Sequence, residues 1–269
     1  MQKTGIEWAD YSWNPVSGCR HGCEYCYARK IAARWGKTPE QKAFEPAYHE
    51  GKSMELKPHT KGVVFIGSNC DLWGSWVPDE WIQHTIWRGN ANEHAALMYL
   101  TKNPARYAEF VKDFDPKGRA WLGTTLDDGY ESTAPLVYDG YESTAPLVYD
   151  RITAIGRLDY PRKWVSIEPL HFDYSHAYYD DLLDRLQSIG WVVIGTETRS
   201  GKPVPKGHEP DVTDVWEIIE GARMLKKIPV FVKDSIHQLW PDEDWPREFP
   251  TGVALATKQA AWKPKVKGP

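Results

Sequence analysis

The stretch VVFIGSNCD at residues 63–71 shows how this chain is built. Its first four residues are apolar without interruption, which is typical of a strand buried on both faces of a parallel sheet. Its last four, Ser68, Asn69, Cys70 and Asp71, place a hydroxyl, an amide, a thiol and a carboxylate directly after that strand. We therefore expect a parallel α/β sheet whose functional groups gather where the strands end.

The same pattern of an apolar run followed by polar residues recurs along the chain. We expect strands at residues 6–13, 63–66, 95–100, 120–125, 163–167, 191–194 and 228–232, and helices at 27–35, 78–87, 105–111, 146–158, 178–187 and 212–225. Alternation of strands and helices predicts parallel βαβ units, so the expected fold is a partial or nearly closed TIM-like (β/α) barrel with its site on one rim. The polar residues that follow the later strands are Lys102, Thr124, Asp127, Glu168, Glu197 and Lys233.

Length and composition fit one large domain. The chain has 269 residues and a formal net charge of −4, which argues against a generally basic nucleic-acid coat but is compatible with a local basic face. No run approaches the roughly 18 apolar residues of a membrane span, and we expect a soluble, cytoplasmic protein.

We assign residues 1–235 to the barrel domain and 236–269, rich in Trp, Pro and Lys, to an extension that caps it. Residues 37–61 show no periodicity and are interpreted as a crossover or lid.

Three of the four cysteines, Cys19, Cys23 and Cys26, lie close together near the start of the chain. Gaps of three and then two residues allow three thiolates from one loop to converge on a soft metal centre. Iron-sulfur clusters are usually held by four cysteines. A three-cysteine loop therefore either borrows a distant ligand or leaves one iron open to bind a small molecule.

Two simpler interpretations of this loop stay open. Three thiolates and His21 could hold a structural zinc ion, although such sites draw their ligands from two separated pairs and Cys70 stands alone. The thiols could also be unliganded. A disulfide fits poorly, because it leaves one cysteine over and belongs to short secreted chains, whereas clustered thiols suit a reducing compartment. We favour the open iron-sulfur cluster.

The sequence GCRHGCEYCYAR at residues 18–29 resembles the cluster loop of radical S-adenosylmethionine (SAM) enzymes, in which an aromatic residue precedes the third cysteine. In detail it is similar to the loop of spore photoproduct lyase-like DNA repair photolyases. Further segments resemble a phage and bacterial three-cysteine radical SAM family whose reaction is not assigned. They lie at residues 5–8, 13–15, 71–73, 77–78, 100–104, 121–123, 165–170 and 230–233. The resemblance therefore spans nearly the whole chain.

This resemblance implies a [4Fe-4S] cluster on Cys19, Cys23 and Cys26, with S-adenosylmethionine on the fourth iron. Cleavage of SAM would give a 5′-deoxyadenosyl radical that abstracts hydrogen from a substrate, for which a DNA or RNA base is the candidate. An electron donor such as a flavodoxin or ferredoxin is implied as well. No membrane partner is expected, because the sequence has no apolar run long enough to span one. The cofactor-binding residues that we expect are Tyr25, Ser68, Asn69, Asp71, Thr124, Asp127 and Glu168. Within this set, Asn69 or Asp71 would contact the amino group of SAM, and Thr124 or Asp127 its ribose.

The chain departs from many radical SAM relatives after its second strand, where residues 68–71 replace a Gly-Gly-Glu stretch. Photoproduct lyases use an extra cysteine to return a hydrogen atom to the substrate radical, which makes Cys70 a candidate catalytic residue. The alternative is a small buried thiol at a strand end. Glu168, Glu197, Lys102 and Lys233 could bind substrate or cofactor, or form structural ion pairs. Two alternative functions remain: radical modification of a tRNA base, peptide or small metabolite, and a non-catalytic metal-binding module.

One segment of the chain is duplicated. Residues 128–138 recur unchanged at 139–149. A single tandem copy does not make a solenoid, which needs several stacked repeats. We expect the surplus copy to form a surface loop and Pro146 to begin the following helix.

Overall fold

The computed structural model describes residues 1–23, 25–51, 55–115, 118–127, 145–170, 185–196, 209–254 and 256. The main sheet has the strands β1 (Gln2–Lys3), β2 (Tyr11–Trp13), β5 (Gly62–Ile66), β6 (Ala95–Thr101), β7 (Ala120–Leu126), β8 (Lys163–Ile167), β9 (Val192–Ile194) and β10 (Val230–Val232). They lie side by side in that order. β1 is antiparallel to β2, and every other neighbouring pair is parallel. A small antiparallel pair, β3 (Val16–Ser17) and β4 (Ala47–Tyr48), stands apart from this sheet.

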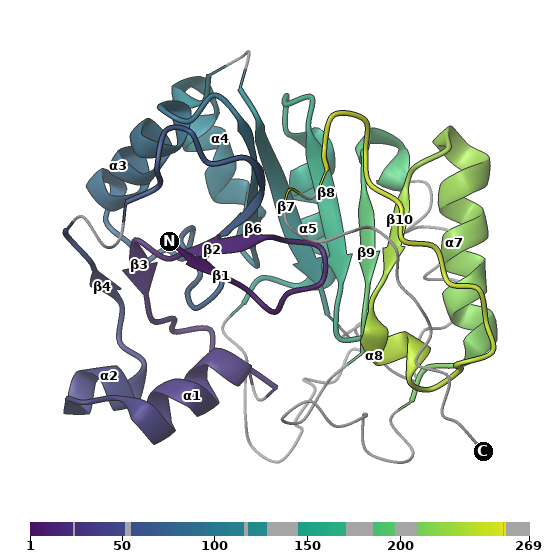
Figure 1. The fold of residues 1–269 in the computed structure, drawn as a ribbon, viewed down its shortest axis with the longest axis horizontal. Coiled ribbons are helices and arrows are strands. Elements are labelled where there is room, and N and C mark those ends of the chain that lie inside the picture. The colour runs from purple at the N-terminus through teal and green to yellow at the C-terminus, as the bar shows by residue number, and fades with distance from the viewer. Residues whose placement is uncertain are drawn as a thin grey trace.

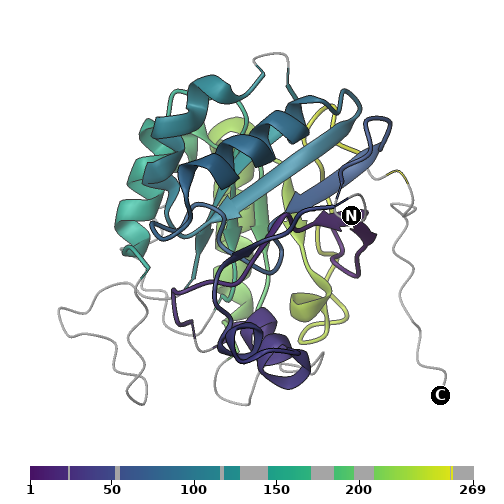
Figure 2. The ribbon, with the colours of Figure 1, turned by 90° about the vertical axis from the view of Figure 1, so that its left-hand side faces the viewer.

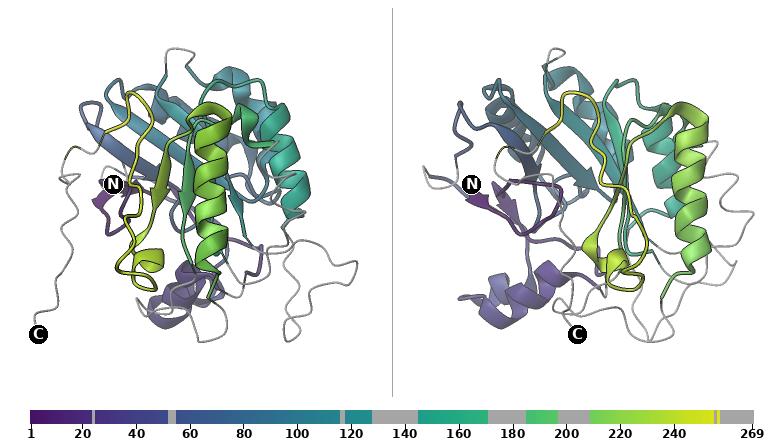
Figure 3. Two further views of the ribbon diagram at one scale, coloured as in Figure 1. Left: turned by 90° about the vertical axis from the view of Figure 1, so that its right-hand side faces the viewer. Right: turned by 45° about the vertical axis from the view of Figure 1, so that its right-hand side comes forward.

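Helices lie along one face of the sheet, and others lie beyond the ends of its strands (Figure 1). The α-helices are α1 (Tyr27–Trp35), α2 (Pro39–Ala43), α3 (Asp79–Asn90), α4 (Tyr107–Phe110), α5 (Val148–Arg157), α7 (Val212–Lys226) and α8 (Asp234–His237). Short 3₁₀ helices are η2 (Pro104–Arg106), η3 (Val111–Asp113) and η4 (Leu186–Ser188). In Figures 2 and 3, α3, α5 and α7 pack along one side, while the N-terminal segment runs on the other.

The parallel α/β arrangement predicted from the sequence is confirmed. The predicted helix 27–35 and strand 163–167 coincide with α1 and β8. Among the described residues the sheet does not close, because β10 pairs with β9 alone and the opposite edge is β1, so a barrel is not confirmed. Residues 128–144, Glu197 and most of the expected helix 178–187 lie outside the described residues.

Three local predictions need correction. Residues 37–61 are not without structure, since they contain α2 and β4. The predicted helix 105–111 is divided into η2, α4 and η3. The first long strand begins at Tyr11 rather than residue 6, because a turn that joins Ala9 N to Ile6 O precedes it.

Side-chain alternation along the strands creates two separate cores, one on each face of the sheet. On the helix side, strand residues such as Val64, Leu122 and Val165 pack with the apolar faces of the helices. On the other side, Val63, Phe65, Met98, Trp121, Trp164, Trp191, Val193 and Phe231 pack with Trp8 and Val253. We call this second side the inner face.

Three tryptophans form the middle of the inner-face core. Trp8 comes from the N-terminal segment, and its ring centroid lies 5.2 Å from that of Trp164 and 5.9 Å from that of Trp191. Trp164 and Trp191 are 5.5 Å apart. The indole N–H groups of Trp164 and Trp191 donate to backbone oxygens of Tyr99 and Glu248 at 2.9 Å each. Aromatic burial of this kind is held in one geometry by both packing and hydrogen bonds.

Residues near 247 cover the β10 edge of the sheet. The backbone N–H of Val232 donates to Pro246 O at 2.8 Å, and that of Glu248 donates to Val230 O at 2.9 Å. A covered edge strand offers few unpaired backbone groups to another chain. Among the described residues, no helix is long and apolar enough to cross a membrane.

Candidate functional site

A cavity of about 440 Å³ opens on the inner face, where the carboxyl ends of the strands meet. We call it the carboxyl-end cavity. Of the metal-binding, cofactor-binding and catalytic residues predicted from the sequence, all but Thr124 and Asp127 line it: Cys19, Cys23, Tyr25, Cys26, Ser68, Asn69, Cys70, Asp71 and Glu168. The further candidate Glu197 lies outside the described residues. Residues from a parallel sheet converge here because all its strands point the same way. The expected rim therefore exists as one cavity.

The cysteine loop, residues 18–26, is held from both sides. Gly18 has φ of +87°, and a Cβ there would lie 2.1 Å from Glu45 O, so only glycine fits without a shift. Arg29 on α1 donates to Cys19 O at 2.7 Å. Backbone N–H groups approach two of the sulfurs, that of His21 at 3.5 Å from Cys19 Sγ and that of Arg29 at 3.4 Å from Cys26 Sγ. The loop is therefore shaped around its sulfur atoms.

All four cysteines are thiols in this structure, and none forms a disulfide. Burial, reinforced by the nearby Asp71 carboxylate, raises the pKa of Cys19 to about 12. Within the described residues, no three His, Cys, Asp or Glu side chains are close enough to hold a single metal ion. The convergence on one metal centre that the spacing predicts is thus not seen, and the thiols instead share one cavity wall.

The Asp71 carboxylate is the most heavily hydrogen-bonded group of the site. Oδ2 accepts from His21 Nε2 at 2.8 Å and from the Lys102 N–H at 2.9 Å. Oδ1 accepts from Thr101 Oγ1 at 2.6 Å and from the Trp73 N–H at 3.0 Å. Burial alone would raise the pKa of Asp71, but these donors hold it below its usual value. Asp71 therefore ties the cysteine loop to the ends of β5 and β6.

The neighbours of Asp71 differ in how far their polar atoms are satisfied. Ser68 exchanges hydrogen bonds with Asn14 at 3.1 and 3.2 Å, and its carbonyl oxygen accepts from the Tyr27 hydroxyl. Asn69 instead has a side-chain oxygen that is buried without a hydrogen-bond partner. A buried acceptor without a partner is costly, so Asn69 Oδ1 is the group most suited to accept from a bound ligand.

Tyr25 is fixed by a buried charge cluster that the sequence did not reveal. Its hydroxyl donates to Asp127, and Lys102 Nζ donates to both. Arg151 on α5 completes the cluster by pairing with the other Asp127 oxygen. Burial would raise the pKa of Asp127, but Lys102 and Arg151 hold it well below its usual range. Asp127 thus does not line the cavity but holds Tyr25, which does, in place.

Thr124 lies on the other face of β7, because side chains alternate along a strand. Its hydroxyl is fully buried and donates to Thr101 O at 2.9 Å. The next residue, Thr125, lines the cavity in its place. The expected contact between Thr124 and a ribose therefore has no support in this geometry.

The wall opposite the cysteine loop carries acidic and basic groups. Lys233 at the end of β10 forms an ion pair with Glu168. Glu7 accepts from the Asp234 N–H at 2.6 Å and from Arg247 at 3.2 Å, and burial raises its pKa. Glu7 lies in the segment 5–8 that carries the family resemblance, but the sequence assigns it no role at the site. Glu7, Glu168 and Lys233 therefore give the cavity polar groups in addition to those near the thiols.

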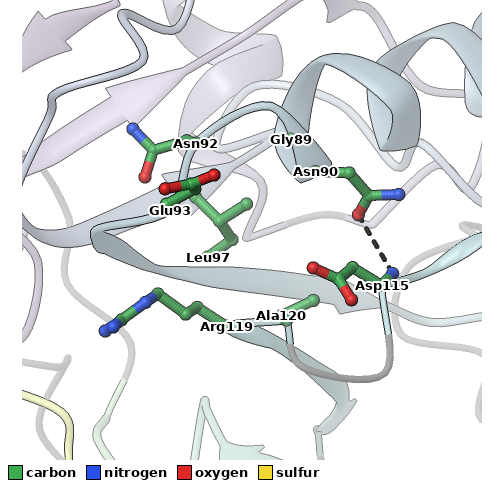
Figure 4. A pocket seen from close by; sticks show the side chains of 9 residues that line it. Gly89, Asn90, Asn92, Glu93, Leu97, Asp115, Arg119 and Ala120 are labelled. Atoms are coloured by element: carbon green, nitrogen blue, oxygen red, sulfur yellow. Dashed lines mark hydrogen bonds between the residues drawn. The ribbon is translucent and has the colours of Figure 1, made fainter.

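A second, smaller pocket of about 250 Å³ lies at the amino ends of β6 and β7 (Figure 4). We call it the amino-end pocket. The Asn90 side chain lies across it, accepting from the Asp115 N–H at 3.3 Å and donating to Asp113 O at 2.7 Å. Glu93 and Arg119 also line this pocket. No cysteine and no buried ion pair among the described residues lines it.

Comparison with solved structures identifies the fold as the one found in spore photoproduct lyase. A cysteine-to-serine mutant of that enzyme aligns with a TM-score of 0.59 and 12% identity, over 86% of this chain and 78% of that one. A double mutant with bound AdoMet and dinucleoside spore photoproduct gives 0.58 and 11%, with the same coverage. The enzyme complexed with dinucleoside spore photoproduct gives 0.56 and 12%, again over 86% and 78%. At such identities the likeness establishes the fold.

The family follows from the sequence. The family model described as "Protein of unknown function (DUF5131)" matches residues 3–217, so the chain belongs to the DUF5131 family. No curated protein matches the chain significantly. The matched residues include the whole cysteine loop and the ends of β5 to β9, whereas Lys233 and α8 follow them.

Proposed function

We propose that this chain is a radical SAM enzyme that binds a [4Fe-4S] cluster through Cys19, Cys23 and Cys26. The observation that carries the proposal is the shared wall of the carboxyl-end cavity. Three thiols at the spacing of a radical SAM loop line it together with Asn69, whose buried oxygen has no partner. A solved structure of the same fold that contains AdoMet supports the proposal.

The donor set and its surroundings fit an iron-sulfur cluster. Three soft thiolate ligands come from one loop, and backbone N–H groups lie near two of the sulfurs. Cys26 is also the N-cap of α1, so the positive end of the helix dipole lies beside its sulfur and would favour an anionic cluster bound there. Because the pKa of Cys19 is raised, binding of the cluster must displace a proton from its thiol.

When bound, the cluster and SAM would supply the electron and the 5′-deoxyadenosyl radical that removes a hydrogen atom from the substrate. The chain itself positions and encloses them. A volume of about 440 Å³ lies within the usual range for small-molecule sites. Asn69 Oδ1 would accept from the amino group of SAM, because both oxygens of Asp71 are already used by four protein donors.

Tyr25 would contact the cofactor through its ring, since Lys102 and Asp127 hold its hydroxyl. Ser68 borders the same space, and Glu168 reaches it from the opposite wall. Asp127 contributes by fixing Tyr25. In this proposal residues 1–235 would form the partial barrel and residues 236–269 its cap.

A base of DNA or RNA is our candidate substrate. Support comes from the lyase structures of the same fold that hold a dinucleoside spore photoproduct. The wall with Glu168 and Lys233 would meet this substrate through hydrogen bonds. Cys70 would return the hydrogen atom, since it lines the same cavity and burial raises its pKa well above the usual value, which keeps its S–H intact.

Anaerobic reconstitution tests the enzyme class. The protein is supplied with iron and sulfide, reduced with dithionite and given SAM, and 5′-deoxyadenosine is measured. We expect cluster absorbance and nucleoside formation in the wild type, and loss of both in a Cys19→Ala, Cys23→Ala, Cys26→Ala variant. Cys70→Ala is the matched control and should keep its cluster. Absence of a cluster, or one equivalent of zinc in its place, would reject the proposal in favour of a metal-binding module.

A second experiment tests the substrate and the role of Cys70. Ultraviolet-irradiated DNA is incubated with the reduced enzyme and SAM, and the base products are separated. Repair by the wild type and an altered product profile from Cys70→Ala are expected. An unchanged rate and profile in Cys70→Ala would remove the donor role.

A further inference from the structure

The outward side of α1 exposes an apolar stripe. Tyr27, Ile31 and Trp35 are 53%, 54% and 69% exposed. Residues four apart lie on one face of a helix, so these three side chains form one row about 12 Å long, at a rise of about 1.5 Å per residue. We call this row the α1 stripe. Only Ala28 of this helix is buried, so α1 presents most of its surface outward.

Basic residues flank the α1 stripe. Lys30 and Arg34 are exposed beside it, and the Arg34 guanidinium lies 5.1 Å from the centre of the Trp35 ring. Residues 27–43 contain five Lys or Arg and a single acidic residue, whereas the whole chain has a net charge of −4. The stripe is therefore a local positive surface with an apolar centre on an acidic protein.

One end of the α1 stripe reaches the thiols. Tyr27 follows Cys26 directly and lines the carboxyl-end cavity, although half of its surface is exposed. The Arg29 N–H, one turn into α1, lies against Cys26 Sγ. Figures 1 and 2 place α1 and α2 beyond the ends of the strands, away from the helices that cover the sheet. The stripe thus begins directly after the cysteine loop and runs along the exposed side of the helix that follows it.

We propose that the α1 stripe is the docking surface for a small acidic protein that carries one electron. This inference rests on the proposed function, because a cluster behind the cysteine loop needs a reductant. In the complex the carrier loses one electron and is oxidised, while the cluster gains it and is reduced. No bond forms or breaks, and no proton is required. SAM and substrate fill the inner side of the loop, so the carrier approaches from the outer side.

The composition of the α1 stripe favours a protein over a nucleic acid. Tyr27 and Trp35 carry rings, but the central residue, Ile31, interrupts the row on which successive bases could stack. Trp and Arg together are typical of the central contacts of protein interfaces. The short row matches the small, weak interfaces of electron-transfer partners, and its exposed charges make binding sensitive to salt.

The experiment uses the reconstituted protein with two acidic carriers, a flavodoxin and a [2Fe–2S] ferredoxin. Binding is measured by calorimetry at low and high salt, and cluster bleaching is followed with reduced carrier or with dithionite. The test variants are Trp35→Ala and Arg34→Glu, with Arg34→Lys as the conservative change. The matched controls are Trp87→Ala, on α3 with 66% exposure, and Arg157→Glu, at the exposed end of α5.

We expect each test variant to bind at least one carrier about tenfold more weakly, which corresponds to about 1.4 kcal/mol, and to be reduced more slowly by it. Arg34→Lys should retain binding, added salt should weaken it, and dithionite should bleach every variant at the wild-type rate. Test variants that bind and accept electrons like the wild type would overturn the proposal. Failure of both carriers to bind the wild type would also overturn it. So would test variants that bind a single-stranded oligonucleotide more weakly than the wild type but bind both carriers normally. A protein that forms no cluster would instead refute the proposed function.

Discussion

The carboxyl-end cavity and the amino-end pocket lie at opposite ends of the same strands, yet their chemistry differs. In the amino-end pocket, the Asn90 amide makes hydrogen bonds through both its oxygen and its nitrogen. The carboxyl-end cavity has a buried amide oxygen without a partner at Asn69 and a buried carboxylate at Asp71, with the charge cluster of Asp127 behind its wall. Buried charges and unmet hydrogen bonds destabilise a fold unless a partner or ligand compensates them. Protein donors already compensate Asp71 and Asp127, so the unmet Asn69 oxygen is the feature of the carboxyl-end cavity that favours a ligand there.

The largest expected difference between the two ends concerns Asp127. Asp127→Ala would leave Arg151 and Lys102 with buried, uncompensated charge, so we expect the free energy of unfolding to fall by about 3–5 kcal/mol. Glu93→Ala in the amino-end pocket removes an exposed carboxylate and should stay within about 0.5 kcal/mol. Urea unfolding measures both. Equal free energies of unfolding for the two variants would contradict the proposed difference between the carboxyl-end cavity and the amino-end pocket.

Lowering the pH should also reduce the free energy of unfolding through the carboxyl-end groups. The loss should be smaller than that from Asp127→Ala, because a protonated carboxyl group still accepts hydrogen bonds. The pKa values of Asp71 and Asp127 are lowered in the folded protein. Their stabilisation is therefore complete above the unfolded carboxyl pKa of about 4 and is lost as the pH falls toward the lower folded values.

The urea midpoint measured from pH 6 to pH 3 tests this dependence. Asp127→Asn should flatten the fall below about pH 4, because it removes one of the two buried carboxyl groups whose pKa is lowered. Glu93→Gln should keep the wild-type slope. A wild-type midpoint that rises on acidification would contradict the lowered pKa values.

The smallest expected effect separates two asparagines. Asn69→Ala removes a side-chain oxygen that makes no hydrogen bond, so the free energy of unfolding of the unliganded protein should change by no more than about 0.5 kcal/mol. SAM binding should weaken about tenfold. Asn90→Ala should lower the free energy of unfolding by about 1 kcal/mol and leave SAM binding unchanged. Urea unfolding and calorimetric titration give the two readouts. If both variants changed stability and SAM binding equally, the carboxyl-end cavity and the amino-end pocket would not differ in ligand binding.

Local sequence was enough to predict the elements whose pattern is set by neighbours along the chain. β8 and α1 have the predicted bounds, since an uninterrupted apolar run and a stretch without helix breakers are local signals. The helix α2 was missed although its start carries a recognisable signal. Thr38 caps it, Pro39 occupies its first turn and Glu40 follows, a sequence typical of a helix N-terminus.

The contacts that fix the site could not be predicted from spacing. His21 and Asp71 are 50 residues apart, and Tyr25 and Asp127 are 102 apart, so no local pattern links the partners. The sequence suggests His21 only as a zinc ligand, whereas in the structure its Nε2 donates to Asp71. Thr124 shows a second limit: a strand end was located correctly, but one residue of register decides which face a side chain occupies.

Trp8, Trp164 and Trp191 pack together and give the inner face an intrinsic spectroscopic signal. Indole rings whose centroids lie 5 to 6 Å apart share their excited states, so they should give a strong near-ultraviolet circular dichroism signal in the folded protein. Trp8 also lines the carboxyl-end cavity. An unlabelled sample would therefore report on occupancy of the cavity through its own absorption and fluorescence.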